Sequence, residues 1–246
     1  MIPKVIYQTW ATKELSDGMN KLSKSWKINN PFYKYIIYDD NDCYEFIKKN
    51  FNKDILEAYN NLKYNALKAD LWRYCILYLK GGFYADIDTL CMSSLDSFYN
   101  KKTELVTPID FGKKYHLFNA FIGVIPKHPI MKYCIESIVE NTKKKTDYKD
   151  KRDVAGPGVL GKATNMYLKR DKETVFDYFG YLKLNNDNNI HFLWFRYVDQ
   201  HILDIKFRKT LFQNKNGNKQ IENIYKKECK RLNISVEWGT NYSYIN

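Results

Sequence analysis

Residues 65–90 read NALKADLWRYCILYLKGGFYADIDTL, a stretch that predicts a helix followed directly by a strand. Its first half carries apolar residues at helical spacing, Asn65 is the expected helix cap, and Gly81-Gly82 is a typical helix stop. The run from Phe83 to Asp88 then has the β-rich character of a strand that ends in acidic residues. We therefore expect this helix–strand unit to form the centre of the fold.

The charged residues of this stretch predict a site. Asp70 and Arg73 are three residues apart, so they share one helix face. In a strand, Asp86 and Asp88 would point to the same side, because side chains alternate with period two. Paired carboxylates suit Mg²⁺ or Mn²⁺, and ligands bind at the carboxyl ends of strands in open α/β sheets. Such a metal can neutralise a substrate diphosphate, which Arg73 could also bind.

A plainer interpretation also exists for these residues. Asp70 and Arg73 would form a surface ion pair worth less than about 1 kcal/mol, and Asp86 and Asp88 would cap a loop. The combined pattern Asp-x-x-Arg followed by Gly-Gly-x-Tyr-x-Asp-x-Asp, in a helix-to-strand context, is much more specific than an isolated Asp-x-Asp. We therefore favour the metal and diphosphate site.

Outward from this unit, helices and strands alternate through the first half of the chain. This alternation predicts an α/β fold with a mostly parallel central sheet flanked by helices, in a single domain over 1–246. Strands are expected at Val5–Trp10, Tyr33–Tyr38, Glu104–Ile109, Phe118–Ile125, Val175–Leu184, Ile190–Phe195 and Ile234–Trp238. Further helices are expected at Glu14–Lys27, Asp39–Asn50, Lys53–Leu62, Pro129–Asn141, Val159–Lys169 and Ile221–Leu232, and Lys143–Arg152 as a mobile surface loop.

Composition narrows the class of protein. The 246 residues are 44% hydrophobic and 16% aromatic, enough to bury a core, and no apolar run is long enough to span a membrane. The N-terminus has no apolar signal segment, and five widely spaced cysteines without a Cys-x-x-Cys pair fit a reducing compartment, so we expect a cytoplasmic chain. The abundance of Lys, Asn, Ile and Tyr suggests an AT-rich genome such as that of a giant virus.

Two other functions stay open at this point. A metal-dependent phosphoryl or nucleotidyl transferase could use the same aspartates, although the chain lacks a Gly-x-x-x-x-Gly-Lys-Ser/Thr phosphate loop. A non-enzymatic nucleic-acid-binding protein would explain the net charge of +12, which is mostly lysine and is more simply a solvated surface. With only four histidines, a Ser-His-Asp type of site has little support.

The stretch Ala66–Leu90 resembles the sugar-nucleotide-binding region of glycosyltransferase family 32, the group of the Och1-like mannosyltransferases. The same region is similar to the nucleotide-sugar core of the clostridial glucosylating toxins. Further segments match the family in order: IPKVIYQTW at 2–10, NAFIGVIPKHP at 119–129, and Gly156-Pro157. The resemblance covers roughly residues 2–170.

The resemblance implies a GT-A fold and a retaining transfer of sugar from a nucleotide-sugar donor, with a UDP-sugar slightly favoured over a GDP-sugar, to a hydroxyl of a glycan or protein. It also implies that Asp86 and Asp88 hold Mn²⁺ or Mg²⁺ against the diphosphate, while Asp70 and Arg73 bind the sugar hydroxyls and a phosphate. The leaving phosphate would take the acceptor's proton on the same face. Residues 1–130 would bind the donor and 131–246 would supply acceptor-side and closing elements. No specific nucleic acid is expected as a partner.

Further positions carry over from the same resemblance. Tyr84 and Gln8 would line the donor pocket, and Trp10 would lie near the nucleoside, although a core aromatic is an equally good interpretation of Trp10. Asn119 would face the reaction centre, or would be a polar residue at a strand edge. Family members close the site with a His shortly before a Trp, but this chain has Glu237 before Trp238, which makes Glu237 the candidate third metal ligand. His191 and His201 are other candidates, and a lone His in an aromatic strand is more often a core residue.

Overall fold

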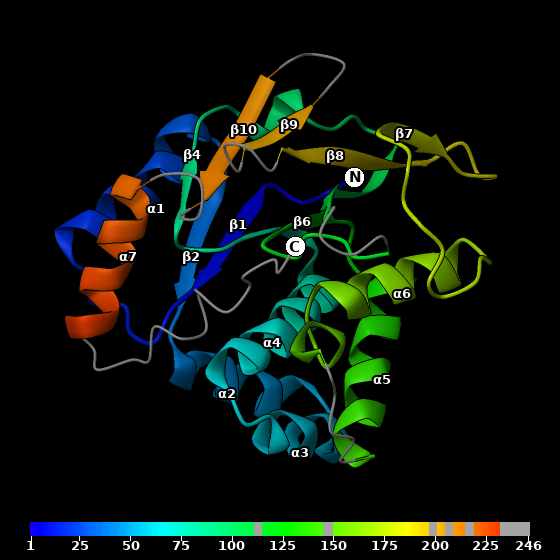
Figure 1. Cartoon of the computed structure of the whole chain (residues 1–246), viewed down its shortest axis with the longest axis horizontal. Coiled ribbons are helices and arrows are strands. Elements are labelled where there is room, and N and C mark those ends of the chain that lie inside the picture. Colours follow the sequence, from blue (N-terminus) through cyan, green and yellow to red (C-terminus); the bar gives the residue numbers. More distant parts are fainter. Residues whose placement is uncertain (111–114, 145–149, 197–200, 205–208, 215–218, 232–246) are drawn as a thin grey trace.

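The computed structural model describes residues 1–110, 115–144, 150–196, 201–204, 209–214 and 219–231 (Figure 1). The strands are β1 (Val5–Thr9), β2 (Lys34–Tyr38), β3 (Gly82–Ala85), β4 (Thr89–Cys91), β5 (Thr103–Ile109), β6 (Phe121–Val124), β7 (Gly180–Lys183), β8 (Asn189–Arg196), β9 (His201–Asp204) and β10 (Lys209–Asn214). The helices are α1 (Asp17–Asn29), α2 (Asp40–Asn50), α3 (Lys53–Asn61), α4 (Asn65–Lys80), α5 (Pro129–Lys143), α6 (Pro157–Tyr167) and α7 (Lys219–Arg231), with short 3-10 turns at Leu95–Ser97 and Lys151–Asp153.

The strands form one sheet in the order β2-β1-β3-β6-β5-β8-β9-β10-β4, and β7 pairs with β8 beside this path. β1 pairs in parallel with β2 and β3, and β5 pairs in parallel with β8, whereas β6 runs antiparallel between β3 and β5. Between β2 and β8, β6 is therefore the strand that runs opposite to the others. This arrangement confirms the predicted α/β class with a largely parallel central sheet. Beyond β8, the strands β9, β10 and β4 alternate in direction.

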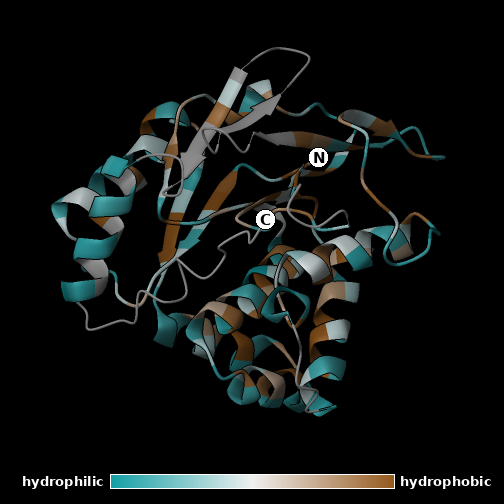
Figure 2. Ribbon diagram, in the orientation of Figure 1, coloured by the Kyte–Doolittle hydropathy of each residue, from teal (hydrophilic) through white to brown (hydrophobic). Residues whose placement is uncertain are grey.

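Two layers of helices cover the sheet. Figure 1 shows α2 to α6 gathered on one side of it, while α1 and α7 lie side by side elsewhere. Adjacent residues of each strand enter different cores, as the pleat of a strand requires. Tyr7, Tyr84, Leu105 and Ile122 pack in the core under α2 to α6, and their neighbours Ile6, Phe83, Val106 and Phe121 pack in a second core with Trp26 of α1. Figure 2 shows brown segments in both β1 and β2, whereas the outer turns of α1 are mostly teal.

Helix starts follow local sequence signals, with one correction. Asp39 and Asp42 form a capping box at the start of α2, as the acidic run predicts. Asn65 does not cap α4, because the helix begins at Asn65 itself and Tyr64 occupies the cap position. The Asn65 amide instead donates to the carboxylate of Asp40, at 3.1 Å between Nδ2 and Oδ2.

The strand after α4 is shorter than predicted. β3 ends at Ala85, so Asp86 and Asp88 lie in the turn between β3 and β4, and the period-two argument for their orientation does not apply. The Asp86 carbonyl accepts hydrogen bonds from two side chains, Gln8 of β1 at 3.0 Å and Thr89 of β4 at 2.5 Å. These side chains occupy the carbonyl that a longer strand would pair, while the Asp86 amide still donates to the Ala120 carbonyl at 2.9 Å, and the chain turns at the carboxyl end of β3.

Several other expectations are refined. The expected strand at 175–184 is confined to β7, and the expected loop at 143–152 contains the end of α5 and a 3-10 turn, with 145–149 outside the described residues. The expected run at 234–238 also lies outside them.

Among the cysteines with described side chains, Cys43, Cys75, Cys91 and Cys134 are buried and free, as predicted. Within the described part of the chain, no helix is long and apolar enough to cross a membrane.

Candidate active site

An ion pair on α4 forms the base of the candidate site. Nη2 of Arg73 lies 3.1 Å from Oδ1 of Asp70, and the two residues are only 6% and 9% exposed. This burial rules out the surface ion pair considered from the sequence. A buried ion pair is tolerated only when its remaining donors and acceptors are also satisfied. The neighbouring side chains and carbonyls supply those partners.

Arg73 connects the helix to two strands. Its Nη1 donates to the Asn119 carbonyl at 2.7 Å and lies 3.3 Å from Oδ1 of Asp86. The guanidinium carbon lies 4.2 Å from the centre of the Tyr84 ring, within the range of a cation–π contact. One cation therefore joins α4, the end of β3 and the segment that leads into β6.

Asn119 contacts the same pair from the opposite direction. Its amide nitrogen donates to Oδ1 of Asp70 at 2.8 Å and to the Tyr74 hydroxyl at 3.2 Å. The Tyr74 hydroxyl in turn donates to the Gly156 carbonyl at 3.1 Å. Asn119 is 6% exposed, so it belongs to a buried polar network and is not simply a polar residue at a strand edge. The structure thus brings together Asp70, Arg73 and Asn119.

Asp86 is fixed at both its backbone and its side chain. The Tyr84 hydroxyl donates to Oδ1 of Asp86 at 2.7 Å, while Gln8 and Thr89 hold the Asp86 carbonyl. Gln8 is fully buried and also accepts a hydrogen bond from the Tyr35 hydroxyl, so both ends of its amide are engaged within the protein. The Asp86 side chain itself is 33% exposed. Gln8 and Tyr84 therefore hold Asp86 in place at the carboxyl end of β3.

The remaining predicted residues differ in their surroundings. Asp88 lies two residues further along the turn and is 7% exposed. Trp10 is partly buried and packs against the cluster of Met19, Leu22 and Ile87. Part of its ring therefore belongs to the hydrophobic core. His191 is buried, with Nδ1 at 2.6 Å from the Phe98 carbonyl, as expected of a core histidine.

The third metal ligand falls outside the described structure. Glu237 and Trp238 lie in 232–246, and the side chain of His201 is also not described. Among the residues that are described, no group of three or more His, Cys, Asp and Glu side chains could hold a metal. The carboxylates of Asp86 and Asp88 are hard oxygen donors, which is the ligand type that Mg²⁺ and Mn²⁺ prefer.

Burial controls the ionisation of the network. Burial raises the pKa of Asp70 to about 6, against the opposing effect of Arg73. Burial disfavours the Arg73 cation, but Tyr84, Asp70 and Asp86 hold the pKa of Arg73 above its usual value. Burial also raises the pKa of Tyr74 and Tyr84 well above the ordinary range, so both hydroxyls stay protonated donors at neutral pH.

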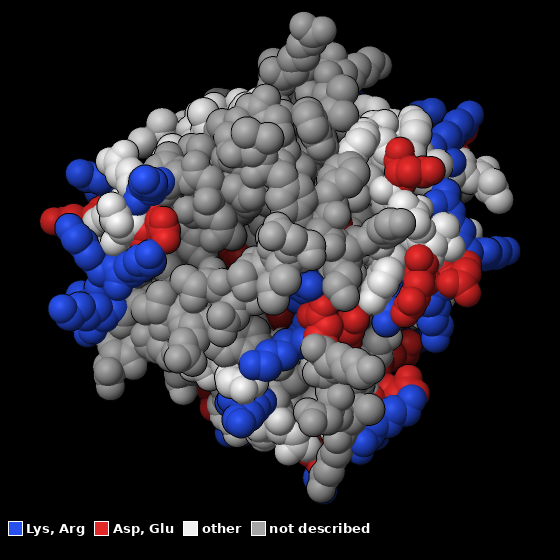
Figure 3. Space-filling model, in the orientation of Figure 1, with Lys and Arg blue, Asp and Glu red and all other residues white. Residues whose placement is uncertain are grey.

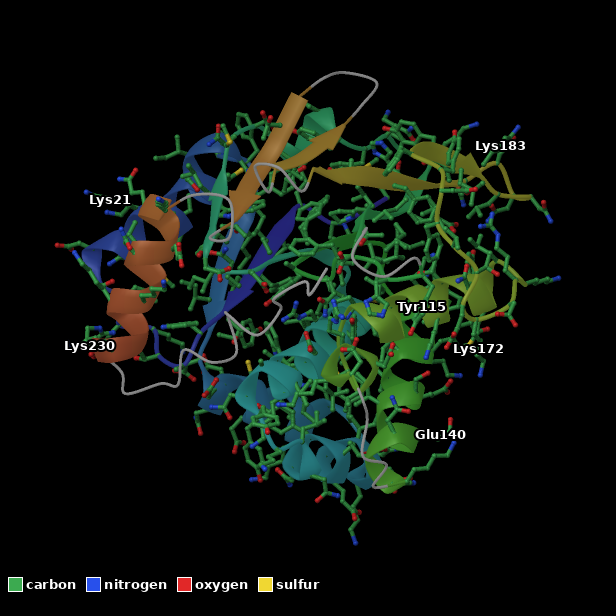
Figure 4. The ribbon with its side chains drawn as sticks, in the orientation of Figure 1. Lys21, Tyr115, Glu140, Lys172, Lys183 and Lys230 are labelled. Carbon is green, nitrogen blue, oxygen red and sulfur yellow. The ribbon has the colours of Figure 1, made fainter. Side chains whose placement is uncertain are left out.

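The sequence analysis gave no role in the site to Tyr74, and it named Gly156 only as part of a segment that matches the family. Tyr74 follows Asp70 by four residues, so its place on the same helix face could have been inferred. Its partner Gly156 is 82 positions away, and no local pattern announces that contact. Figure 4 shows side chains filling the space between α4 and the sheet.

Comparison with solved structures defines the class of fold. The structure titled "PaToxG Glycosyltransferase" superposes with a TM-score of 0.57 and 23% identity, covering 68% of this chain and 70% of that one. The α/β sheet with its flanking helices has the GT-A fold. This likeness concerns the fold and confirms the architecture that the sequence resemblance implied.

Residues 16–105 match the family model described as "Glycosyltransferase sugar-binding region containing DXD motif". Inositol phosphoceramide mannosyltransferase 2 of Schizosaccharomyces pombe is 32% identical over 145 residues, which is 58% of this chain and 40% of that protein. An uncharacterised glycosyltransferase of Acanthamoeba polyphaga mimivirus is 31% identical over 147 residues, 56% of each chain. The initiation-specific alpha-1,6-mannosyltransferase of S. pombe is 28% identical over 195 residues, 68% of this chain and 49% of that protein. The chain thus spans about half the length of these relatives.

Proposed function

We propose that the chain is a metal-dependent, retaining glycosyltransferase that moves a sugar from a nucleotide-sugar donor to a hydroxyl of a glycan or protein acceptor. One observation carries the proposal. Arg73 joins the buried network of Asp70, Arg73 and Asn119 directly to Asp86, at the carboxyl end of β3. All of these residues except Asn119 lie inside the region, 16–105, that matches a sugar-binding family. Ligands bind at the carboxyl ends of strands in such sheets.

In this proposal, Asp86 and Asp88 hold the divalent cation. When bound, the cation supplies positive charge that neutralises the diphosphate leaving group. Tyr84 and Arg73 fix one oxygen of the Asp86 carboxylate, and Gln8 fixes the backbone behind it. This preorganisation spares the site the cost of ordering the carboxylate when the donor arrives.

Asp70 and Asn119 are proposed to face the donor sugar. Arg73 has a side chain that is 7% exposed and contacts Asp70, Asp86 and the Asn119 carbonyl. We therefore assign to Arg73 the task of orienting these groups, and its direct contact with a phosphate stays a prediction. The division into a donor side (1–130) and an acceptor side (131–246) also stays a prediction.

For the sugar, we propose a mannosyl group first, because two of the relatives above are named mannosyltransferases. The expected preference for UDP over GDP is untested, so both nucleotides belong in the assay. The described side chains on one face of the molecule do not favour a nucleic-acid-binding role. On the face shown in Figure 3, basic side chains lie on both flanks and are interspersed with acidic ones.

The test is a thermal-shift and hydrolysis panel of UDP- and GDP-sugars, with and without Mn²⁺. We expect one nucleotide diphosphate to stabilise the wild-type chain only when metal is present, and Asp88→Ala to abolish that effect. Asp177→Ala is the matched control, because Asp177 is an exposed acid far along the chain from the site. Equal shifts with and without metal, or a full response in Asp88→Ala, would contradict the proposal.

A further inference from the structure

The segment that leads to Asn119 and the segment that contains Gly156 both contact the buried network, and they also contact each other. Asn119 ends one segment and donates to Asp70. Gly156 belongs to the other, accepts from the Tyr74 hydroxyl, and approaches Asp70 so closely that an added Cβ would lie 3.5 Å from Oδ2. A backbone hydrogen bond from Leu117 to the Pro157 carbonyl, at 3.2 Å, links the two segments. The placement of one segment therefore constrains that of the other.

A histidine and an aspartate make the side-chain link between them. His116, three residues before Asn119, is fully buried, and its Nε2 lies 3.4 Å from Oδ1 of Asp153, three residues before Gly156. Neither ring nitrogen of His116 has a hydrogen-bond partner within the described part of the chain. Among the described residues, the Asp153 carboxylate is the acidic group that faces this imidazole. A buried ring with unmet polar atoms costs stability, so its placement here needs a reason.

Asp153 is itself held in position. The Tyr115 hydroxyl donates to both of its carboxylate oxygens, at 3.1 and 3.0 Å, and Nζ of Lys162 lies 3.7 Å from Oδ1. Figure 4 shows Tyr115 beside α6. The first turn of α6 leaves room for the contact, because a Cβ at Gly158 would lie 1.9 Å from Oδ1 of Asp153 and 2.8 Å from Nε2 of His116. The close approach of His116 and Asp153 therefore depends on glycine at 158.

We propose that His116 and Asp153 form a positioning pair, which sets where Asn119 and Gly156 stand against Asp70 and so shapes the part of the site that meets the donor sugar. The inference rests on the proposed function, since it assumes that Asp70 and Asn119 face the sugar. His116 and Asp153 act through these residues and do not contact the donor themselves.

This placement separates two kinds of binding. The diphosphate is proposed to bind at Asp86 and Asp88, whereas the sugar meets Asp70 and Asn119. Loss of the positioning pair should therefore weaken recognition of the sugar and leave recognition of the nucleoside diphosphate nearly intact. A purely structural role would lower the melting temperature and would change both affinities in the same proportion.

Calorimetry with Mn²⁺ can measure the two affinities separately. UDP is paired with UDP-glucose and GDP with GDP-mannose, and the readout is the ratio of the diphosphate dissociation constant to that of its nucleotide sugar. For His116→Gln and Asp153→Asn we expect this ratio to fall about 10- to 100-fold, because misplaced Asp70 and Asn119 would lose hydrogen bonds to the sugar, with the diphosphate constant within about twofold of wild type. Gly158→Ala, which forces the pair apart while keeping both side chains, should act in the same direction.

His191→Gln is the matched control, because His191 is a buried histidine on another strand, β8, with its Nδ1 2.6 Å from the Phe98 carbonyl. It should lower the melting temperature without changing the ratio. The inference fails if the wild type discriminates the sugar and His116→Gln discriminates it equally well, or if His191→Gln lowers the ratio as much. A wild-type chain that binds neither diphosphate nor nucleotide sugar would overturn the proposed function, and this inference with it.

Discussion

Oδ1 of Asp70 receives two partners at once, Nη2 of Arg73 at 3.1 Å and Nδ2 of Asn119 at 2.8 Å. This single oxygen therefore joins helix α4 to the segment before β6 inside the protein. Both partners favour the ionised carboxylate, but burial outweighs them and the pKa of Asp70 is raised to about 6. An aspartate that titrates near neutrality is a measurable property of the site.

Asp70→Asn should change how stability depends on pH. Because the folded-state pKa of Asp70 lies above its ordinary value of 3.8, the folded protein holds this proton more tightly. The contribution of Asp70 to the unfolding free energy is therefore full below pH 3.8 and is lost as the pH rises through 6, a difference of about 3 kcal/mol. Urea denaturation from pH 4 to 8 should show this loss in the wild type and not in Asp70→Asn. Asp177→Asn, at an exposed position, should keep the wild-type dependence of unfolding free energy on pH. If the Asp70→Asn profile runs parallel to the wild-type profile, Asp70 is not the group with the raised pKa.

Arg73→Met should destabilise the fold strongly. It leaves the Asp70 carboxylate buried without its cation, which costs about 3–5 kcal/mol of unfolding free energy. The double variant Asp70→Leu with Arg73→Met removes both charges, so we expect it to lose clearly less than the sum of the two single variants. Denaturant titration of all four proteins completes the cycle. Strict additivity would mean that the two side chains do not stabilise each other.

The sequence predicted much of this site because its core is local. Asp70 and Arg73 lie on one helix face, and Asp86 follows the next strand, so spacing alone placed them near each other. The family resemblance brought Asn119 into the same site. The sequence did not predict that Arg73 would be almost fully enclosed, because that depends on the Asn119 carbonyl and the Tyr84 ring.

The parts that were missed depend on contacts between distant segments. β4 and β9 have only three and four residues, too few for a clear alternation, and β10 pairs with these two strands, which lie far from one another in the sequence. β3 was predicted too long because the hydrogen bonds from Gln8 and Thr89 that end it come from side chains. An alternation of apolar and polar residues indicates which side chains are buried. It does not indicate which group donates a hydrogen bond to a given backbone carbonyl.

Tyr84→Phe should separate the two roles of Tyr84. The ring would still lie under Arg73, but the 2.7 Å hydrogen bond to Asp86 would be lost. We expect a stability loss of only about 0.5–1.5 kcal/mol, together with a clear loss of the metal-dependent thermal shift, because the Asp86 carboxylate is no longer oriented. Tyr59→Phe is the control, since Tyr59 is a buried tyrosine on α3. An unchanged metal response in Tyr84→Phe would show that its hydroxyl does not position Asp86.

Gly81→Ala tests the turn that aims β3 at the site. Gly81 has a φ of 61°, and an added Cβ would lie 2.6 Å from the Pro126 nitrogen, so alanine meets both backbone strain and a clash. Gly180→Ala is the matched control, because Gly180 also has positive φ, at 104°, but its Cβ would meet only the Tyr178 hydroxyl at 3.7 Å. We expect Gly180→Ala to cost about 1–2 kcal/mol of unfolding free energy from strain, and Gly81→Ala to cost clearly more. Thermal and urea denaturation measure both losses. Equal losses would mean that Pro126 can move aside, and the turn between α4 and β3 would then not be what fixes the direction of β3.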